Sequence, residues 1–242
     1  MNLIILEPGD VGCDGDVTLT ATRADHLLHV LHVERGYEVR VGVLDGPRGT
    51  GVVQSIDAGS VALHCRFEPE VPVRPKVDLL LAVPRPKVMR RLWAQIAALG
   101  VGQIILTNAE KVERNYFDTH ILAPETYRPL LIEGLQQARD TRLPAVSIHR
   151  QFKILIEDRL DDLFGSGRRV VADPSATRSL TDVVRVSGHE RTLLAIGPEG
   201  GWNGFELSLL AAHGFQSVGM GPRTLRTDTA CVALLALAHD AM

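Results

Sequence analysis

Continuous apolar strands that alternate with helices restrict the fold of this chain more than any other feature of its sequence. A strand that is apolar along its whole length must be covered on both faces, which is typical of a parallel sheet with helices on each side. The pattern therefore predicts an α/β domain over residues 76–242, with a first helix ending at Gly100 and a longer one over residues 124–139. The strand segments are "KVDLLLAV", "GQIILT", "RRVVAD", "RTLLAIG" and "FQSVGMG".

Residues 1–70 have a different sequence pattern, with short runs of β-branched residues separated by Asp-Gly and Gly-rich turns. Such runs predict a small β-barrel domain. One helix interrupts it in "ADHLLHVLHVERG", where Leu27, Val30 and Leu31 share helical spacing and Gly36 provides a stop. The segment "PEVPVRP" at 69–75 carries three prolines and predicts a linker between the two domains.

The cysteine content and the apolar runs exclude several classes of protein. Three cysteines that lie far apart without a CxxC pair indicate neither a disulfide framework nor a zinc site, so we expect no metal and a reducing, cytoplasmic location. The N-terminal segment lacks the basic start of a signal peptide. The longest apolar run, "ACVALLALA" at 230–238, is about half the length that a membrane span needs, so no membrane association is expected.

Charge is distributed unevenly along the chain, although the net charge is only −3. Residues 1–70 hold 5 Lys and Arg against 11 Asp and Glu, whereas residues 71–150 hold 12 against 7. A basic middle segment is compatible with a surface that binds a polyanion such as RNA. It is equally compatible with a solvated helix face, and charge alone does not distinguish the two.

Three turns follow predicted strands in the second domain, namely "ADPSAT" at 172–177, "GPEGGWN" at 197–203 and "GMGPRTLRTD" at 219–228. Ligands of parallel sheets bind where strands end and helices begin, so we expect the chemistry at these turns. Neither glycine-rich turn spells a dinucleotide or Walker phosphate loop. Tight structural turns are the alternative interpretation. Asn203 and Glu206 form a capping-box pattern, which predicts a helix that begins there and ends at Gly214.

Two of these turns also carry a family resemblance. "GPEGG" at 197–201 and "GPRTLRT" at 221–227, followed by Asp228, Thr229 and Ala230, closely resemble the C-terminal signature of the ribosomal RNA small subunit methyltransferase E family. Weaker similarity extends over nearly the whole chain. The combined pattern is long and specific, unlike a single glycine motif.

The resemblance implies an enzyme that uses S-adenosylmethionine to methylate N3 of a uridine in 16S rRNA of the small ribosomal subunit. It also implies a fold that periodicity does not predict: a SPOUT-class domain over residues 76–242, whose C-terminal chain forms a deep trefoil knot, preceded by a PUA-like RNA-binding barrel over residues 1–70. Knots of this kind are rare exceptions to normal chain topology. Family members are expected to act as homodimers.

The resemblance also implies roles for individual residues. Arg226 is the candidate that stabilises negative charge on the uracil oxygens. Glu199 and Asp228 are candidate general bases, although an acid at Asp228 also suits the first turn of the final helix. The expected cofactor-binding residues are Ile196, Gly197, Gly201, Met220, Gly221 and Leu225. The expected RNA-binding residues are His26, Arg85, Lys87, Arg90, Lys111, Arg114, Arg139, Arg142 and Arg223.

Several positions depart from the family pattern, and all lie outside the cofactor turns. Histidines or uncharged residues replace the usual charged ones at His29, His32, Gln95 and Ala98, and Asp140 stands where arginine is common. Two alternatives follow: a SPOUT methyltransferase that acts on a different RNA, and a catalytically silent protein that binds RNA or assists ribosome assembly.

Overall fold

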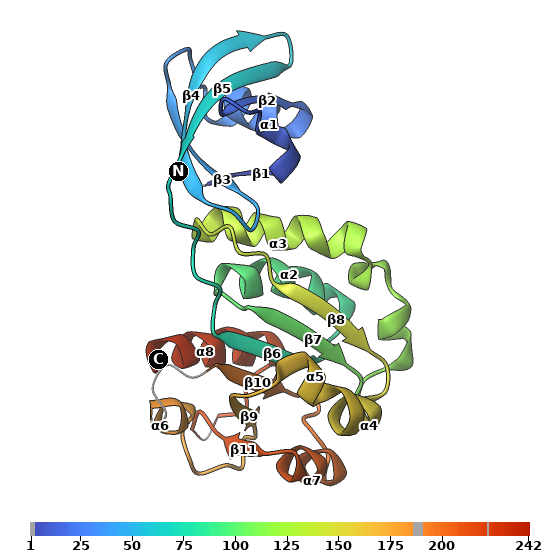
Figure 1. Cartoon of the computed structure of the whole chain (residues 1–242). Helices are drawn as coiled ribbons and strands as arrows, with labels where there is room; N and C mark the ends of the chain where they lie inside the picture. Colours follow the sequence, from blue (N-terminus) through green and yellow to red (C-terminus); the bar gives the residue numbers. More distant parts are fainter. Residues whose placement is uncertain (1–2, 186–190, 222) are drawn as a thin grey trace. The chain divides into compact units, whose positions relative to one another are not determined.

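The chain forms two compact units in the computed structural model, which describes residues 3–185, 191–221 and 223–242 (Figure 1). Unit 1 consists of Met1–Arg74 and Leu135–Leu143, and unit 2 consists of Pro75–Gly134 and Pro144–Met242. The segment Leu135–Leu143 therefore groups with the N-terminal residues, although it lies far beyond the proline-rich linker in the sequence.

Unit 1 is built on a five-stranded sheet with the order β1-β3-β4-β5-β2. Strands β3, β4 and β5 form an antiparallel meander, β2 adds to β5 in antiparallel orientation, and β1 adds to β3 in parallel. Alternating apolar side chains from these strands, among them Leu19, Val41 and Leu63, form the core together with Leu27 of the helix. The strands are β1 Ile4–Leu6, β2 Asp16–Thr20, β3 Glu38–Val43, β4 Arg48–Asp57 and β5 Ser60–Phe67.

The helix of unit 1 is shorter than the sequence predicts. It comprises α1 (Ala21–Asp25) and a π-helical turn η2 (His26–Val30), and it does not continue to Gly36. The last turn widens because the Leu31 N–H donates to the His26 carbonyl, and the chain then reverses at His32, which has a φ of 49°. Val30 is consequently 61% exposed, although it was expected to share a helical face with Leu27, which is fully buried.

Hydrogen bonds explain why Leu135–Leu143 belongs to unit 1. The Leu3 N–H donates to the Gln136 carbonyl (3.0 Å), and the Thr141 hydroxyl donates to the Gly46 carbonyl (2.6 Å). The Arg142 guanidinium donates to the carbonyls of Pro72 (2.5 Å) and Asp45 (3.1 Å). The segment is thus held by main-chain donors and acceptors from several parts of the N-terminal chain.

Unit 2 is an α/β structure with an entirely parallel sheet, as predicted, and the sheet has six strands. The strand order is β11-β9-β10-β6-β7-β8. Strand β8, at one edge, was not predicted because its residues are only partly buried and do not form an apolar run. The strands are β6 Val77–Ala82, β7 Gln103–Thr107, β8 Ala145–His149, β9 Arg168–Ala172, β10 Thr192–Ile196 and β11 Phe215–Val218.

Helices cover this sheet, and the last of them packs at its centre. Helix α8 (Thr227–Asp240) contacts β10 and β6 as well as α2 (Pro86–Ala98) and α6 (Leu180–Arg185) (Figure 1). Helix α7 (Gly204–Ala212) packs against β11. The remaining helical segments are η1 Pro8–Asp10, η3 Arg114–Asp118, η4 His120–Leu122, α3 Pro124–Ala138, α4 Phe152–Ile154, η5 Leu155–Arg159 and α5 Leu160–Phe164.

One buried ion pair and two absences complete the description of the described residues. Asp78 is fully buried in the apolar strand β6, where Arg191 pairs with it at 2.5 Å, since a buried carboxylate requires a charged partner. Within the described ranges, no three His, Cys, Asp or Glu residues are grouped to hold a metal ion. None of the helices described is both long and apolar enough to cross a membrane.

Candidate functional site

The three turns predicted to carry the chemistry meet at one edge of the unit 2 sheet. Strands β11, β9 and β10 are immediate neighbours, and they end at Val218, Ala172 and Ile196. Because the strands are parallel, the turns that follow them leave the sheet on the same side. Together they enclose two adjoining cavities of about 70 and 260 Å³, which share Ala172, Asp173, Pro174, Leu225 and Ala230 in their linings.

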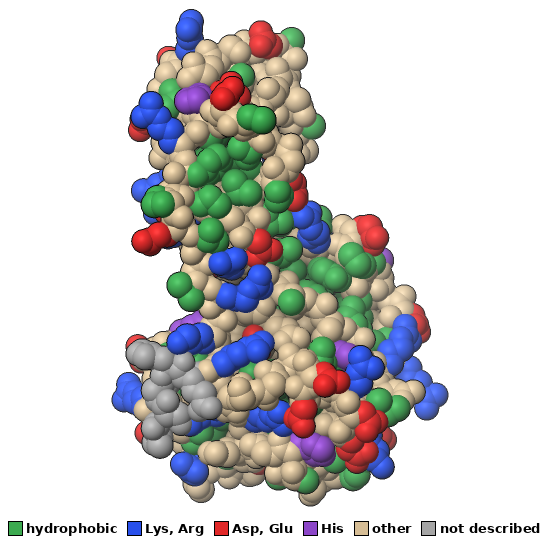
Figure 2. Space-filling model, in the orientation of Figure 1, with side chains coloured by type: hydrophobic (Ala, Val, Ile, Leu, Met, Phe, Trp, Pro, Cys, Tyr) green, Lys and Arg blue, Asp and Glu red, His purple; other side chains and the backbone are tan. Residues whose placement is uncertain are grey.

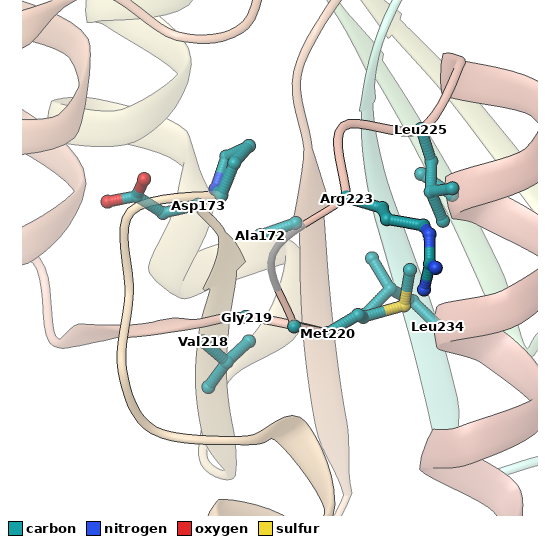
Figure 3. Close-up of a pocket in the computed structure, with 11 residues that line it drawn as sticks. Ala172, Asp173, Val218, Gly219, Met220, Arg223, Leu225 and Leu234 are labelled. Atoms are coloured by element: carbon teal, nitrogen blue, oxygen red, sulfur yellow. The ribbon is translucent and has the colours of Figure 1, made fainter.

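The smaller cavity lies between the turn after β11 and helix α8. The side chains of Met220, Leu225 and Leu234 approach one another on one side of the turn (Figure 3). Arg223 extends its guanidinium toward the same group, whereas the Asp173 carboxylate points away from it. This cavity therefore combines an apolar floor with one exposed cation.

All six predicted cofactor-binding residues line these two cavities. Ile196, Gly197 and Gly201 line the larger one, Met220 and Gly221 line the smaller one, and Leu225 lines both. Gly201 and Gly221 have φ values of 68° and 99°, a conformation that favours glycine. The geometry brings the six residues together, and their role as cofactor ligands stays a prediction.

Gly219 shows how closely two of the turns approach each other. Its N–H donates to the Arg178 carbonyl (2.9 Å), and a Cβ atom at this position would lie 2.6 Å from the Ala176 carbonyl oxygen. Any side chain here would push the turn after β9 away from the turn after β11. The glycine is therefore required by the close approach of two backbones.

Sequence reasoning missed several residues of the larger cavity. Asp173 and Pro174 follow β9 in the turn "ADPSAT", and their position after a strand was the available signal. Trp202 was also missed; it is largely buried, and its indole N–H has no hydrogen-bond partner among the described residues. A buried donor without a partner is uncommon in a folded protein and identifies a place where a bound molecule can supply the acceptor.

A third cavity, of about 390 Å³, brings the three predicted catalytic residues together. Arg226, Glu199 and Asp228 line it, along with Arg85, Val88 and Thr227. It shares Glu199 and Thr227 with the larger cavity described above. A charged cavity thus adjoins an apolar, glycine-lined one, and both are bounded by the same two turns.

The Asp228 carboxylate is hydrogen-bonded to two arginine side chains. Its Oδ2 atom accepts hydrogen bonds from Arg91 (3.0 Å) and Arg226 (3.2 Å), and its side chain is only 17% exposed. It also lies in the first turn of α8, where a negative charge suits the helix dipole. Asp228 is therefore well placed to hold Arg226 in one orientation, and Arg91 from α2 is a partner that the sequence did not predict.

Glu199 has a different environment. Its Oε1 atom accepts a hydrogen bond from the main-chain N–H of Arg85 (3.1 Å), and the residue is exposed and lines the charged cavity. No arginine or lysine pairs with it in the described part of the chain. Of the two candidate bases, Glu199 is thus the one whose carboxylate is not held between guanidinium groups.

The predicted RNA-binding residues are divided between the two units. Arg85, Lys87, Arg90, Lys111, Arg114 and Arg223 belong to unit 2, whereas His26, Arg139 and Arg142 belong to unit 1. Two of them, Lys111 and Arg142, form hydrogen bonds with main-chain carbonyls of this chain. The Lys111 ammonium donates to the Gly200 carbonyl (2.6 Å), and Arg142 donates to carbonyls within unit 1. Asp140, one of the substituted positions, accepts the N–H groups of Thr141 and Arg142 and so stabilises the turn that follows α3.

The predicted capping box of α7 is confirmed and has a second function. Asn203 Oδ1 accepts the Glu206 N–H (2.8 Å), and Glu206 Oε2 accepts the Asn203 N–H (2.7 Å). Glu206 is only 3% exposed, and its other oxygen accepts the Glu110 N–H (2.7 Å). One buried carboxylate therefore fixes both the start of α7 and the loop that follows β7.

We expect Glu206→Ala to lower the free energy of unfolding by about 1–3 kcal/mol, because the N–H groups of Asn203 and Glu110 lose the buried carboxylate that accepts both hydrogen bonds. Urea denaturation followed by circular dichroism measures this. Glu125→Ala is the matched control, since Glu125 also lies in a first helical turn but is exposed; its expected loss is below about 1 kcal/mol. Equal losses in the two variants would contradict the role of Glu206.

Comparison with known proteins identifies the family of this chain. The RNA methyltransferase domain family matches residues 70–239. Ribosomal RNA small subunit methyltransferase E of Treponema pallidum is 31% identical, over 99% of this chain and 92% of that protein. Ribosomal RNA small subunit methyltransferase E 1 of Borreliella burgdorferi is 24% identical, over 90% and 89%. This chain therefore belongs to the ribosomal RNA small subunit methyltransferase E family.

A solved structure has the same fold. Ribosomal RNA small subunit methyltransferase E from Neisseria gonorrhoeae, crystallised with bound S-adenosylmethionine, superimposes with a TM-score of 0.78 at 21% identity. The match covers 99% of this chain and 97% of that one, so both units take part in it.

Proposed function

We propose that this protein transfers a methyl group from S-adenosylmethionine to the rRNA of the small ribosomal subunit, at N3 of a uridine in 16S rRNA. Membership of the family and the names of its relatives support the reaction class. One observation of the structure carries the proposal: the glycine-lined cavities at the ends of β9, β10 and β11 adjoin a cavity that holds Arg226 and Glu199.

The residues of the two adjoining cavities suit S-adenosylmethionine. Glycines at 197, 201, 219 and 221 expose main-chain groups to a ligand. Trp202 adds a buried N–H without a partner, and Leu225 and Leu234 provide apolar contact. When bound, S-adenosylmethionine supplies an electrophilic methyl group on a positively charged sulfur. We assign its binding to Ile196, Gly197, Gly201, Met220, Gly221 and Leu225.

The path of the chain after β11 supports a SPOUT-class knot in this region. Strand β11 is at the edge of the sheet, yet α8 packs on β10 and β6. The connection between them must therefore cross the ends of β9 and β10, where Gly219 lies against Ala176 and Leu225 lines both cavities. We propose that this crossing is the threaded segment of a deep trefoil knot. We also propose that unit 1 is a PUA-like module that binds RNA.

The charged cavity is the proposed site of the acceptor base. Methylation at N3 requires that the imide proton leaves and that the negative charge on O2 and O4 is stabilised. Glu199, which is not paired with a cation in the described chain, accepts this proton. Arg226 donates two N–H groups to the developing charge, and Asp228 holds its guanidinium in place.

Assembly and location complete the proposal. Val232 and Leu237 on α8 are partly exposed apolar side chains, which suits burial against a second copy in a homodimer. Because rRNA is the substrate, we propose that the protein acts in the cytoplasm, where ribosomal subunits are assembled.

A methyl-transfer assay tests the proposed function. Purified protein and S-adenosylmethionine with a tritiated methyl group are incubated with 30S subunits, free 16S rRNA or tRNA from cells that lack this protein. We expect label in one of the two small-subunit substrates, and mass spectrometry should locate it at N3 of a uridine. Label in tRNA alone would favour the alternative of another RNA substrate. Binding of S-adenosylmethionine without transfer to any RNA would favour a catalytically silent protein.

A further inference from the structure

A fourth cavity, of about 300 Å³, lies beside the cofactor turns and is used by no step described so far. Three segments of unit 2 form it: the loop after β7, the start of α4 and the start of α7. The turn after β10 connects it to the larger of the two cavities assigned to S-adenosylmethionine, because residues 197–202 line that cavity while Asn203 and Phe205 line this one. Lys111 strengthens the connection by donating to the Gly200 carbonyl.

The walls of this cavity are held in place before any ligand binds. The Glu206 carboxylate joins the start of α7 to the loop after β7 through the N–H groups of Asn203 and Glu110. Phe152, at the start of α4, packs against Trp202 with ring centroids 5.3 Å apart. A cavity with such fixed walls loses little entropy when it binds a ligand.

The chemical groups of the lining suit a nucleobase. Phe205 is 59% exposed, which is unusual for a phenylalanine and leaves its ring free to stack. Asn108 also lines the cavity, and its Oδ1 atom is buried with no hydrogen-bond partner among the described residues. An aromatic ring beside an amide is a combination that recognises unstacked RNA bases, by stacking and by hydrogen bonds to the base edge.

The charged side chains in and around the lining show whether the cavity favours a nucleobase or a phosphate as its ligand. Arg114 and Lys153 line the cavity, but Glu110 lies in the same lining and Lys153 is 3.9 Å from Glu157. Acidic side chains of unit 2 gather over α4 and α5, the helical stretch that carries Glu157, Asp158, Asp161 and Asp162 (Figure 2). The cavity thus has little net positive charge, which disfavours a phosphate and suits a neutral base.

We propose that this cavity binds an unstacked base of the RNA substrate, on a nucleotide near the one that is methylated. Phe205 stacks on the base, and Asn108 accepts a hydrogen bond from an N–H group on its edge. The proposal rests on the proposed function, because it requires that the substrate is RNA. It adds a specificity-determining subsite that lies outside the cofactor turns.

Phe205→Ala tests the stacking contact. Loss of one base–aromatic stack weakens RNA binding by about 5- to 100-fold, so we expect KM for the rRNA substrate to rise within that range. The Kd for S-adenosylmethionine should stay within about twofold of the wild-type value, since the change lies outside the cofactor cavities. Phe205→Tyr should retain most of the affinity for RNA. Ile154→Ala is the matched control, because Ile154 is a 48% exposed apolar residue of α4, the helix that carries Phe152 and Lys153 of the lining, but does not itself line the cavity.

A second variant reports on the site independently of methyl transfer. Phe205→Trp places a fluorescent ring at the stacking position, and we expect single-stranded rRNA fragments to quench the additional emission. An unchanged KM in Phe205→Ala, together with no quenching in Phe205→Trp, would overturn the proposal. A KM that rises for 30S subunits but not for free rRNA would also overturn it and would indicate a ribosomal protein as the occupant. Failure of the wild-type protein to methylate any RNA would instead contradict the proposed function, while quenching could still be measured.

Discussion

Arg226→Ala should lower kcat for rRNA methylation by about 100- to 1000-fold, the effect of removing one donor that stabilises a developing oxyanion. Arg226 lines the charged cavity and does not line the two cavities assigned to S-adenosylmethionine. The Kd for S-adenosylmethionine should therefore stay within about threefold of the wild-type value. Steady-state assays with tritiated methyl donor measure kcat, and isothermal titration calorimetry measures the Kd.

Two further variants sharpen the test of Arg226. Arg226→Lys keeps the charge but loses the planar pair of N–H donors, so we expect it to restore only part of the lost rate. Arg185→Ala serves as the control, because Arg185 is an exposed arginine of α6 that pairs with Asp240 and lines none of the cavities described. If Arg226→Ala turned over as fast as this control, Arg226 would have no part in the reaction.

Gly219→Val should weaken S-adenosylmethionine binding by about 10- to 100-fold. The new side chain would collide with the Ala176 carbonyl and force apart the two turns that enclose the cofactor cavities. Overpacking of this kind costs about 1–3 kcal/mol, and each 1.4 kcal/mol corresponds to a tenfold change in affinity. Isothermal titration calorimetry measures the loss, and thermal denaturation shows whether the variant is folded at the assay temperature.

Gly204→Ala provides the comparison for Gly219→Val. Gly204 is the first residue of α7, and no atom lies within 4 Å of a Cβ built there. We expect its affinity for S-adenosylmethionine to match that of the wild-type protein. Similar losses in both variants would mean that the cofactor turns do not depend on the close approach at Gly219.

The part of the site that follows from local sequence and sheet geometry was predictable. Continuous apolar strands indicate a parallel sheet, and the carboxyl ends of adjacent parallel strands share one edge, so turns after β9, β10 and β11 were expected to meet there. The capping box of Asn203 and Glu206 spans four residues and depends on little else. Both predictions use rules that act within one element or one sheet.

Contacts between residues far apart in the chain were not predictable in the same way. Arg91 and Asp228 are 137 positions apart, and only the packing of α2 on α8 brings them together. The early end of the helix in unit 1 likewise depends on a π-helical turn and on the positive φ of His32, which leave Val30 exposed. Apolar periodicity identifies which face of a helix can be buried, but it does not show where the partner surface stops.

The assignment of Leu135–Leu143 to unit 1 affects how this protein can be divided or recombined. A fragment that ended at Arg74 would lack the Thr141 hydroxyl bonded to Gly46 and the Arg142 guanidinium bonded to Asp45 and Pro72. Transplanting the N-terminal module onto another enzyme would therefore require two separate stretches of polypeptide. An insertion or deletion in the chain around residue 140 would therefore change unit 1 through a segment that both begins and ends in unit 2.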